Sequence, residues 1–121
     1  MADTSAKKIL IVDDDADIRA YLEALFTENG YEVVVAFDGH EGFQVLKDTN
    51  PDLVTLDLQM PNETGAKFYR KKHKDEELDR IPVIVISGLS GRHLAVGEPA
   101  AVFEKPIDEE KLLEAVRKAI G

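Results

Sequence analysis

The sequence contains no cysteine, which rules out disulfide bonds and thiolate metal sites. It also lacks any apolar run approaching the roughly 20 residues that a membrane-spanning helix needs. The N-terminal residues Met1 to Lys8 are polar and carry no apolar core of a signal peptide. We therefore expect a cytoplasmic protein that does not contact membranes.

Positive charge is scarce, because 15 Lys and Arg residues stand against 24 Asp and Glu residues, for a formal net charge of -9. Such an acidic chain repels phosphate backbones, so we expect no direct binding of nucleic acid. A divalent cation is the more natural ligand. The length of 121 residues, with 44% hydrophobic and 32% charged residues, indicates one globular domain.

Short apolar runs alternate with amphipathic stretches along the whole chain. The apolar runs predict strands at residues 9–12, 32–37, 53–56, 82–86 and 100–103. The amphipathic stretches predict helices near residues 18–26, 41–47, 65–75 and from 108 onward. This alternation is typical of an α/β fold with a doubly wound, five-stranded parallel sheet. Ligands bind such sheets beyond the carboxyl ends of the strands.

Acidic residues stand at two of these strand ends. Asp13, Asp14 and Asp15 follow the first strand, and Asp57 follows the third. If the two strands are adjacent, each carboxylate pair at about 5 Å repels by roughly 3 kcal/mol, which favours binding of a cation such as Mg²⁺. The alternative is that the Asp triplet only favours the start of a helix, and we expect Asp15 to be its N-cap. The second strand-end acid, Asp57, favours the metal site.

Four motifs together resemble the response-regulator receiver family of two-component signalling. They are Val12-Asp13-Asp14-Asp15, Leu56-Asp57-Leu58-Gln59-Met60-Pro61 with Gly65, Ile86-Ser87 and Lys105-Pro106. The resemblance covers residues 8–121 and leaves residues 1–7 as a polar tail. It implies a flavodoxin-like sheet with the strand order 2-1-3-4-5.

The resemblance also implies roles for single residues. Asp57 is the expected phosphoryl acceptor, Asp14 a direct ligand of Mg²⁺, and Asp13 an acid that holds the metal through water. Asp57 and the backbone carbonyl of Gln59 complete the expected metal ligands. A carboxylate can attack phosphorus to give an acyl phosphate.

Two further residues have roles that the resemblance implies. Ser87 is expected to donate a hydrogen bond to the phosphoryl oxygens, and Lys105 to neutralise them. Pro106 implies a cis Lys105-Pro106 bond. The expected donor is a histidine kinase or a histidine phosphotransfer protein, and the expected result is a switch in protein–protein interactions. The domain assists its own phosphorylation and dephosphorylation, so we do not expect an enzyme with an external substrate.

Each of these residues also has a simpler interpretation. Ser87 could be a turn residue, Lys105-Pro106 a surface turn and Gln59 an ordinary loop side chain. We expect the basic run from Lys71 to Lys74 to be a solvated face rather than a docking surface. The three histidines show no metal-ligand spacing, so we expect His40, His73 and His93 at the surface.

The chain departs from the family pattern after the fourth strand. The stretch between Ser87 and Lys105 is shorter than usual and contains Gly88, Gly91, Gly97 and Pro99, so we expect a short or irregular fourth helix. This segment could become ordered on phosphorylation.

The fifth strand departs from the pattern as well. The usual aromatic switch residue is Val102 here, and Phe103 follows it. Alternation along the strand points Phe103 to the opposite face, where we expect it in the core. Ile107 can fill the apolar role of the aromatic that is common after Pro106.

Two other functions compete with a phosphorylated receiver. One is a pseudo-receiver, which uses the same fold only to bind proteins. The other is an aspartyl-phosphate hydrolase, which needs a second Asp two places after the nucleophile. Gln59 stands there and cannot transfer protons, which disfavours the hydrolase.

Overall fold

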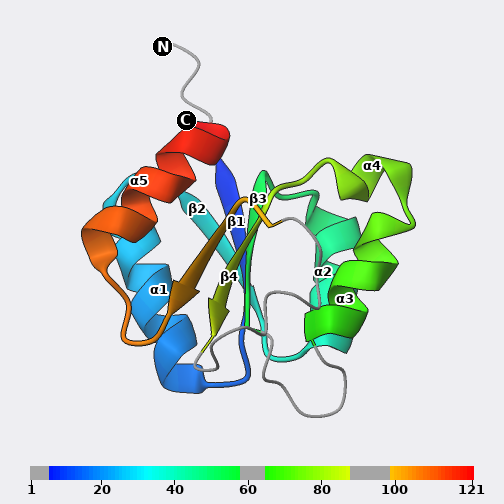
Figure 1. Ribbon diagram of the computed structural model, residues 1–121, viewed down its shortest axis with the longest axis horizontal. Coiled ribbons are helices and arrows are strands. Elements are labelled where there is room, and N and C mark those ends of the chain that lie inside the picture. Colours follow the sequence, from blue (N-terminus) through cyan, green and yellow to red (C-terminus); the bar gives the residue numbers. More distant parts are fainter. Residues whose placement is uncertain (1–5, 58–64, 88–98) are drawn as a thin grey trace.

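A computed structural model describes residues 6–57, 65–87 and 99–121, and the side chains of residues 65, 66 and 87 are outside this description. Strands and helices alternate along the described chain (Figure 1). The strands are β1 (Lys8–Val12), β2 (Glu32–Ala36), β3 (Leu53–Leu56), β4 (Val83–Ser87) and β5 (Ala101–Glu104). The helices are α1 (Ala16–Glu28), α2 (Gly39–Thr49), α3 (Gly65–His73), α4 (Glu76–Asp79) and α5 (Glu109–Ile120). None of the described helices is long and apolar enough to span a bilayer.

All five strands are parallel and lie in the order β2-β1-β3-β4-β5. This order confirms the predicted doubly wound sheet. β2 pairs with one edge of β1, and β3, which comes later in the chain, pairs with the other edge of β1. The strand order therefore reverses between β1 and β3, which is where ligands bind such sheets.

Two apolar layers cover the sheet. Alternate residues of β1 supply both: Ile9 and Ile11 pack with α1 and α5, while Leu10 and Val12 pack with α2, α3 and α4. Figure 1 shows the same division, with α1 and α5 on one side of the strands and α2, α3 and α4 on the other. Because the central strands are buried on both faces, their sequences read as continuous apolar runs.

Aspartates begin most of the described helices. The carboxylate of Asp15 accepts hydrogen bonds from the backbone N–H groups of Asp17 and Ile18, at 2.8 and 3.3 Å, which confirms Asp15 as the N-cap of α1. Asp38 and Asp108 cap α2 and α5 in the same way. Capping by a charged acceptor also favours the positive end of each helix.

The predicted helix over residues 65–75 corresponds to α3, which ends two residues earlier, and a separate short helix follows it. α3 ends at His73, and Asp75 begins the separate short helix α4 by accepting hydrogen bonds from the N–H groups of Glu77 and Leu78. Leu78 of α4 is buried against the core, which holds the turn in place. The short or irregular helix predicted after the fourth strand is a different segment from α4. Residues 88–98 of that segment lie outside the described residues, so the helix and its ordering on phosphorylation stay predictions.

The expected side-chain directions on β5 are confirmed. Phe103 packs against the core on the side of α1 and α5, and Ile107 joins the same layer. Val102 points to the other face and is 40% exposed. An aromatic residue at position 103 therefore supports packing rather than occupying the position of the usual switch.

The basic run after Tyr69 is only partly the solvated face that the sequence suggested. Lys72 is 2% exposed, and its Nζ donates to the backbone carbonyl of Asp79 at 3.1 Å. His73 is exposed as expected, with Nδ1 2.9 Å from Oδ1 of Asp79. His40 is also exposed, and His93 lies outside the described residues.

Burial lowers the pKa of Lys72 below its ordinary value of 10.5. As the pH rises toward 10.5, Lys72 loses its proton in the folded chain while it stays protonated in the unfolded chain. Because the unfolded chain then binds more protons, the free energy of unfolding rises with pH over this range. We expect Lys72→Met to lose this rise and Lys74→Met, at an exposed lysine, to keep it. Urea unfolding from neutral pH upward measures both, and equal slopes in the two variants would contradict the assignment.

Gly42 allows α2 to approach the sheet closely. A Cβ atom there would lie 3.1 Å from both methyl carbons of Val12 and 3.3 Å from Cε2 of Phe68. Both neighbours are fully packed, so little room is available for them to move.

Replacing Gly42 with Val should therefore overpack the α2 layer and lower the free energy of unfolding by about 1–3 kcal/mol. Gln44→Val introduces the same side chain on the exposed side of the same helix. Because Gly→Val by itself raises helix propensity, a loss of stability at position 42 reports the overpacking. Urea titration of both variants gives the comparison, and equal stability would show that the contact at Gly42 is not tight.

Candidate functional site

The register of two neighbouring strands brings two aspartates together. Val12 pairs with Leu56 at the ends of β1 and β3, and the next residues are Asp13 and Asp57. The backbone N–H of Asp57 donates to the carbonyl of Val12 at 3.0 Å, which extends the ladder by one bond. Asp13 is held from the other side, where its N–H donates to the carbonyl of Ala36 at 3.2 Å.

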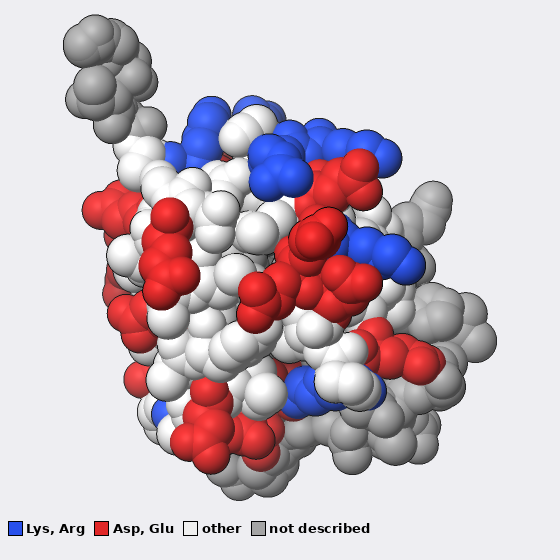
Figure 2. Space-filling model, turned by 90° about the vertical axis from the view of Figure 1, so that its left-hand side faces the viewer, with Lys and Arg blue, Asp and Glu red and all other residues white. Residues whose placement is uncertain are grey.

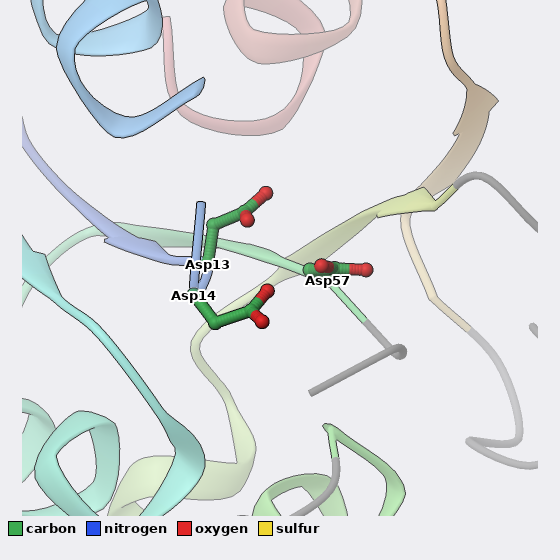
Figure 3. Close-up of side chains that lie close together, drawn as sticks. All are labelled: Asp13, Asp14 and Asp57. Atoms are coloured by element: carbon green, nitrogen blue, oxygen red, sulfur yellow. The ribbon is translucent and has the colours of Figure 1, made fainter. Parts of the chain in front are cut away.

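Three carboxylates gather at this edge of the sheet. Oxygens of Asp13, Asp14 and Asp57 all lie within 4.8 Å of one another. Figure 3 shows Asp13 and Asp14 extending from the end of β1 toward the side where Asp57 follows β3. Asp13 and Asp57 are 2% and 3% exposed, whereas Asp14 is exposed. The cluster is thus buried at its base and open to solvent on the side of Asp14.

Lys105 supplies the positive charge of the site. Its Nζ donates to Oδ2 of Asp13 at 3.4 Å and lies 3.7 Å from Oδ2 of Asp57. Lys105 directly follows β5, and the Lys105-Pro106 bond is cis, as expected. One amine therefore bridges the two buried carboxylates, although β5 and β1 are far apart in the sequence.

The electrostatic balance at Asp13 favours a nearby cation. Burial raises the pKa of Asp13 above its ordinary value of 3.8, and the exposed charge of Asp14 raises it further. The backbone N–H of Asp15, 2.9 Å from Oδ1, and the amine of Lys105 act in the opposite direction. Burial is the largest effect, so a cation beside this carboxylate would offset the free energy that is lost when the charged form is removed from water.

Arg19 is a contact that sequence reasoning missed. Its Nη1 donates to the backbone carbonyl of Asp13 at 2.8 Å. The bond ties the second turn of α1 to the first acid of the site. In the sequence, Arg19 is simply an arginine six residues after Asp13, and this spacing predicts no contact. The hydrogen bond depends on how the chain turns between β1 and α1.

Two predicted site residues cannot be placed. Gln59 and the side chain of Ser87 lie outside the described residues, so both roles stay predictions. Ser87 is the last residue of β4, and its backbone pairs with that of Glu104, the residue directly before Lys105. The structure brings together Asp13, Asp14, Asp57 and Lys105.

The donor set fits a hard divalent cation. All three candidate ligands offer carboxylate oxygens, the atoms that Mg²⁺ prefers. Mg²⁺ also keeps several waters when it binds, and the open side at Asp14 leaves room for them. A cluster of acids is common on protein surfaces, but here two of the three are buried.

Comparison with known families agrees with this geometry. Residues 9–117 match the response regulator receiver domain. The chain belongs to this family. Receiver domains are phosphoacceptor switches rather than classical enzymes, and they interact with histidine kinases or phosphotransfer proteins.

Individual relatives have different overall lengths. The chain is 33% identical over 114 residues to Protein Rrf1 of Nitratidesulfovibrio vulgaris, covering 94% of this chain and 83% of Rrf1. It is 36% identical over 115 residues to the CAI-1 autoinducer sensor kinase/phosphatase CqsS of Vibrio cholerae, but spans 17% of that protein. The signal receiver domain of a signal transduction histidine kinase from Syntrophus aciditrophicus has a similar structure, with a TM-score of 0.88, 30% identity and coverage of 95% of this chain and 90% of that one.

Removing the positive charge of Lys105 should strengthen binding of Mg²⁺. The amine lies 3.4 and 3.7 Å from two of the three carboxylates, so an incoming cation must compete with it. We expect Lys105→Met to raise Mg²⁺ affinity roughly tenfold and Asp14→Asn to lower it by a similar factor. Titration followed by NMR measures both, with Lys111→Met on the exposed start of α5 as the control.

An unchanged Mg²⁺ affinity in Lys105→Met would contradict a shared site for the amine and the ion. An unchanged affinity in Asp14→Asn would show that the open side of the cluster does not contribute a ligand.

Proposed function

We propose that this receiver accepts a phosphoryl group on Asp57 from the phosphohistidine of a histidine kinase or a phosphotransfer protein, and that Mg²⁺ is required. Residues 8–121 form the unit that acts, with residues 1–7 as a polar tail. The observation that carries the proposal is the convergence of Asp13, Asp14 and Asp57 within 4.8 Å, with the amine of Lys105 on two of them.

Asp57 is the best nucleophile of the three acids. Asp13 is held at both carboxylate oxygens, Oδ1 by the N–H of Asp15 and Oδ2 by Lys105, which suits a fixed acid that holds the metal through water. Asp14 is exposed, which suits the direct ligand of Mg²⁺ that the resemblance implies. Asp57 lies between the ladder of β3 and the amine, where a charged group arriving from solvent meets the positive charge of Lys105.

The transfer forms one bond and breaks another. An oxygen of Asp57 forms a bond to phosphorus, and the bond between phosphorus and the donor histidine nitrogen breaks, leaving the electron pair on the imidazole. The product is an acyl phosphate. Bound Mg²⁺ supplies charge neutralisation at the phosphoryl oxygens.

The chain itself contributes charge and position. Lys105 neutralises a phosphoryl oxygen, and the predicted hydrogen bond from Ser87 adds a second contact. Asp13, fixed by Asp15 and Ala36, holds the acidic end of β1 in place. Water later hydrolyses the acyl phosphate at the same site, which resets the domain without a separate enzyme.

The switch begins at Lys105. In the described state its amine is shared between Asp13 and Asp57. A phosphoryl group on Asp57 adds negative charge there and draws the amine away from Asp13. Lys105 is followed within four residues by α5, so its movement is transmitted to the start of that helix. The difference in free energy that phosphorylation creates between the two positions of Lys105 sets how far the population of the domain shifts between its two conformations. The shifted conformation then signals through contact with a protein partner.

Incubation with MgCl₂ and acetyl phosphate, followed by intact-mass measurement, tests the proposal. We expect the mass of one phosphoryl group to be added to the wild-type chain and to the control Asp48→Asn, an exposed acid on α2. Asp57→Asn should remain unlabelled, and so should the wild type in excess EDTA, because each lacks an essential part of the site.

Labelling of Asp57→Asn at the wild-type rate would reject Asp57 as the acceptor. Failure of the correctly folded wild type to be labelled by either acetyl phosphate or a phosphorylated histidine donor would favour the pseudo-receiver instead.

A further inference from the structure

Basic side chains form a stripe along the outer face of α3. Lys67, Arg70, Lys71 and Lys74 follow one another at helical spacings of three, one and three residues, which places them on one side of the helix. Lys67, Arg70 and Lys74 are exposed, and Lys71 is half-buried. The opposite side of α3 is buried through Phe68, so the stripe faces away from the core.

A lysine of the neighbouring helix extends the stripe. Nζ of Lys47 on α2 lies 5.1 Å from the centroid of the Phe43 ring, and Nζ of Lys71 lies 5.6 Å from the same centroid. Figure 1 shows α2 and α3 side by side on one face of the sheet. Two ammonium groups from adjacent helices are thus held at one aromatic ring. We call Lys47, Lys67, Arg70, Lys71 and Lys74 the basic stripe.

The basic stripe contrasts with the rest of the chain. The protein carries a net charge of -9, and Figure 2 shows acidic side chains spread over the face that α1 and α5 form, with Lys and Arg gathered at its upper edge. The basic stripe places five of the 15 Lys and Arg residues on α2, α3 and the residue just after α3. Lys67 with Lys71, and Arg70 with Lys74 just beyond the end of α3, are like-charge pairs four residues apart. Basic side chains in the last turn also favour the negative end of the helix, so the stripe concentrates positive charge without itself weakening α3.

We propose that the basic stripe docks an acidic α-helix of a partner protein. From Lys67 to Lys74 the stripe covers two helical turns, about 10 Å. A partner helix with carboxylates at positions i, i+3, i+4 and i+7 presents the same spacing in opposite charge. The Phe43 ring between Lys47 and Lys71 offers apolar surface at the edge of the contact.

The surroundings of the stripe favour a short acidic segment over an extended polyanion. Asp75, Glu76 and Glu77 follow the stripe directly and are exposed, so a longer anion would meet like charge at that end. At physiological ionic strength charges are screened beyond about 8 Å, and a compact helix therefore responds mainly to the local cations. Nucleic acid or an anionic bilayer would extend over more of a molecule whose net charge is -9.

This contact lies on helix α3 and does not require phosphorylation of Asp57. It therefore extends beyond the proposed phosphoacceptor function, and either of the two can fail without the other. The sequence alone suggested a solvated face for the run from Lys71 to Lys74. The structure changes that interpretation, because it buries Lys72 and adds Lys47 and the ring of Phe43 to the remaining cations.

The test uses the full unphosphorylated chain and a fluorescent alanine-based helical peptide with Glu at i, i+3, i+4 and i+7. A peptide of the same composition with its Glu residues spread around the helix is the matched probe. The stripe variant combines Lys67→Gln, Arg70→Gln, Lys71→Gln and Lys74→Gln. The control variant, with the same net charge, combines Lys7→Gln, Lys111→Gln, Arg117→Gln and Lys118→Gln, all at exposed residues.

We expect the patterned peptide to bind wild type and the control variant equally and the stripe variant about tenfold more weakly, as measured by anisotropy at physiological salt. The scattered peptide should bind all three weakly. Equal affinity of the stripe and control variants would overturn the proposal, as would no binding of the patterned peptide to the wild type. Tighter binding of single-stranded RNA, or of vesicles containing phosphatidylserine, would also overturn it, by assigning the stripe to a different partner.

Discussion

The site depends on the pairing of β1 with β3. Val12 and Leu56 are opposite each other, and the bond from the N–H of Asp57 to the carbonyl of Val12 fixes the two following aspartates side by side. Carboxylates so close repel each other. The repulsion is tolerated because a slip of one residue would exchange the side chains that pack against the helical layers on the two faces of the sheet. Core packing thus supports an arrangement that electrostatics alone would disperse.

Much of the fold could be predicted from the sequence because a parallel sheet with helices on both faces requires apolar runs in its strands. Leu53 to Leu56 is fully buried and was recognised as a strand with its observed bounds. The convergence of Asp13, Asp14 and Asp57 also followed, since carboxyl ends of neighbouring parallel strands share one edge. The family resemblance added Lys105, whose distance to these acids could not be predicted from spacing.

Other features could not be predicted because they depend on how elements pack. Lys72 looked like a surface residue within a basic run, but the turn into α4 places the carbonyl of Asp79 within reach of its amine. Arg19 bonds to Asp13 through a turn whose shape the sequence does not specify. The break between α3 and α4 depends on Asp75 capping a new turn and on Leu78 finding space in the core. In each case a local pattern favoured one outcome and a tertiary contact determined another.

The three consecutive aspartates after β1 restrict how the length of this segment can change in evolution. Asp13 contributes to the buried base of the site, Asp14 to its open side, and Asp15 begins α1. The N–H of Asp15 also bonds to the carboxylate of Asp13, so the helix start and the ion-binding acid share one short backbone segment. Inserting or deleting a single residue there would displace all three roles together. A change in the length of this stretch would therefore have to arise together with compensating changes on both β1 and α1.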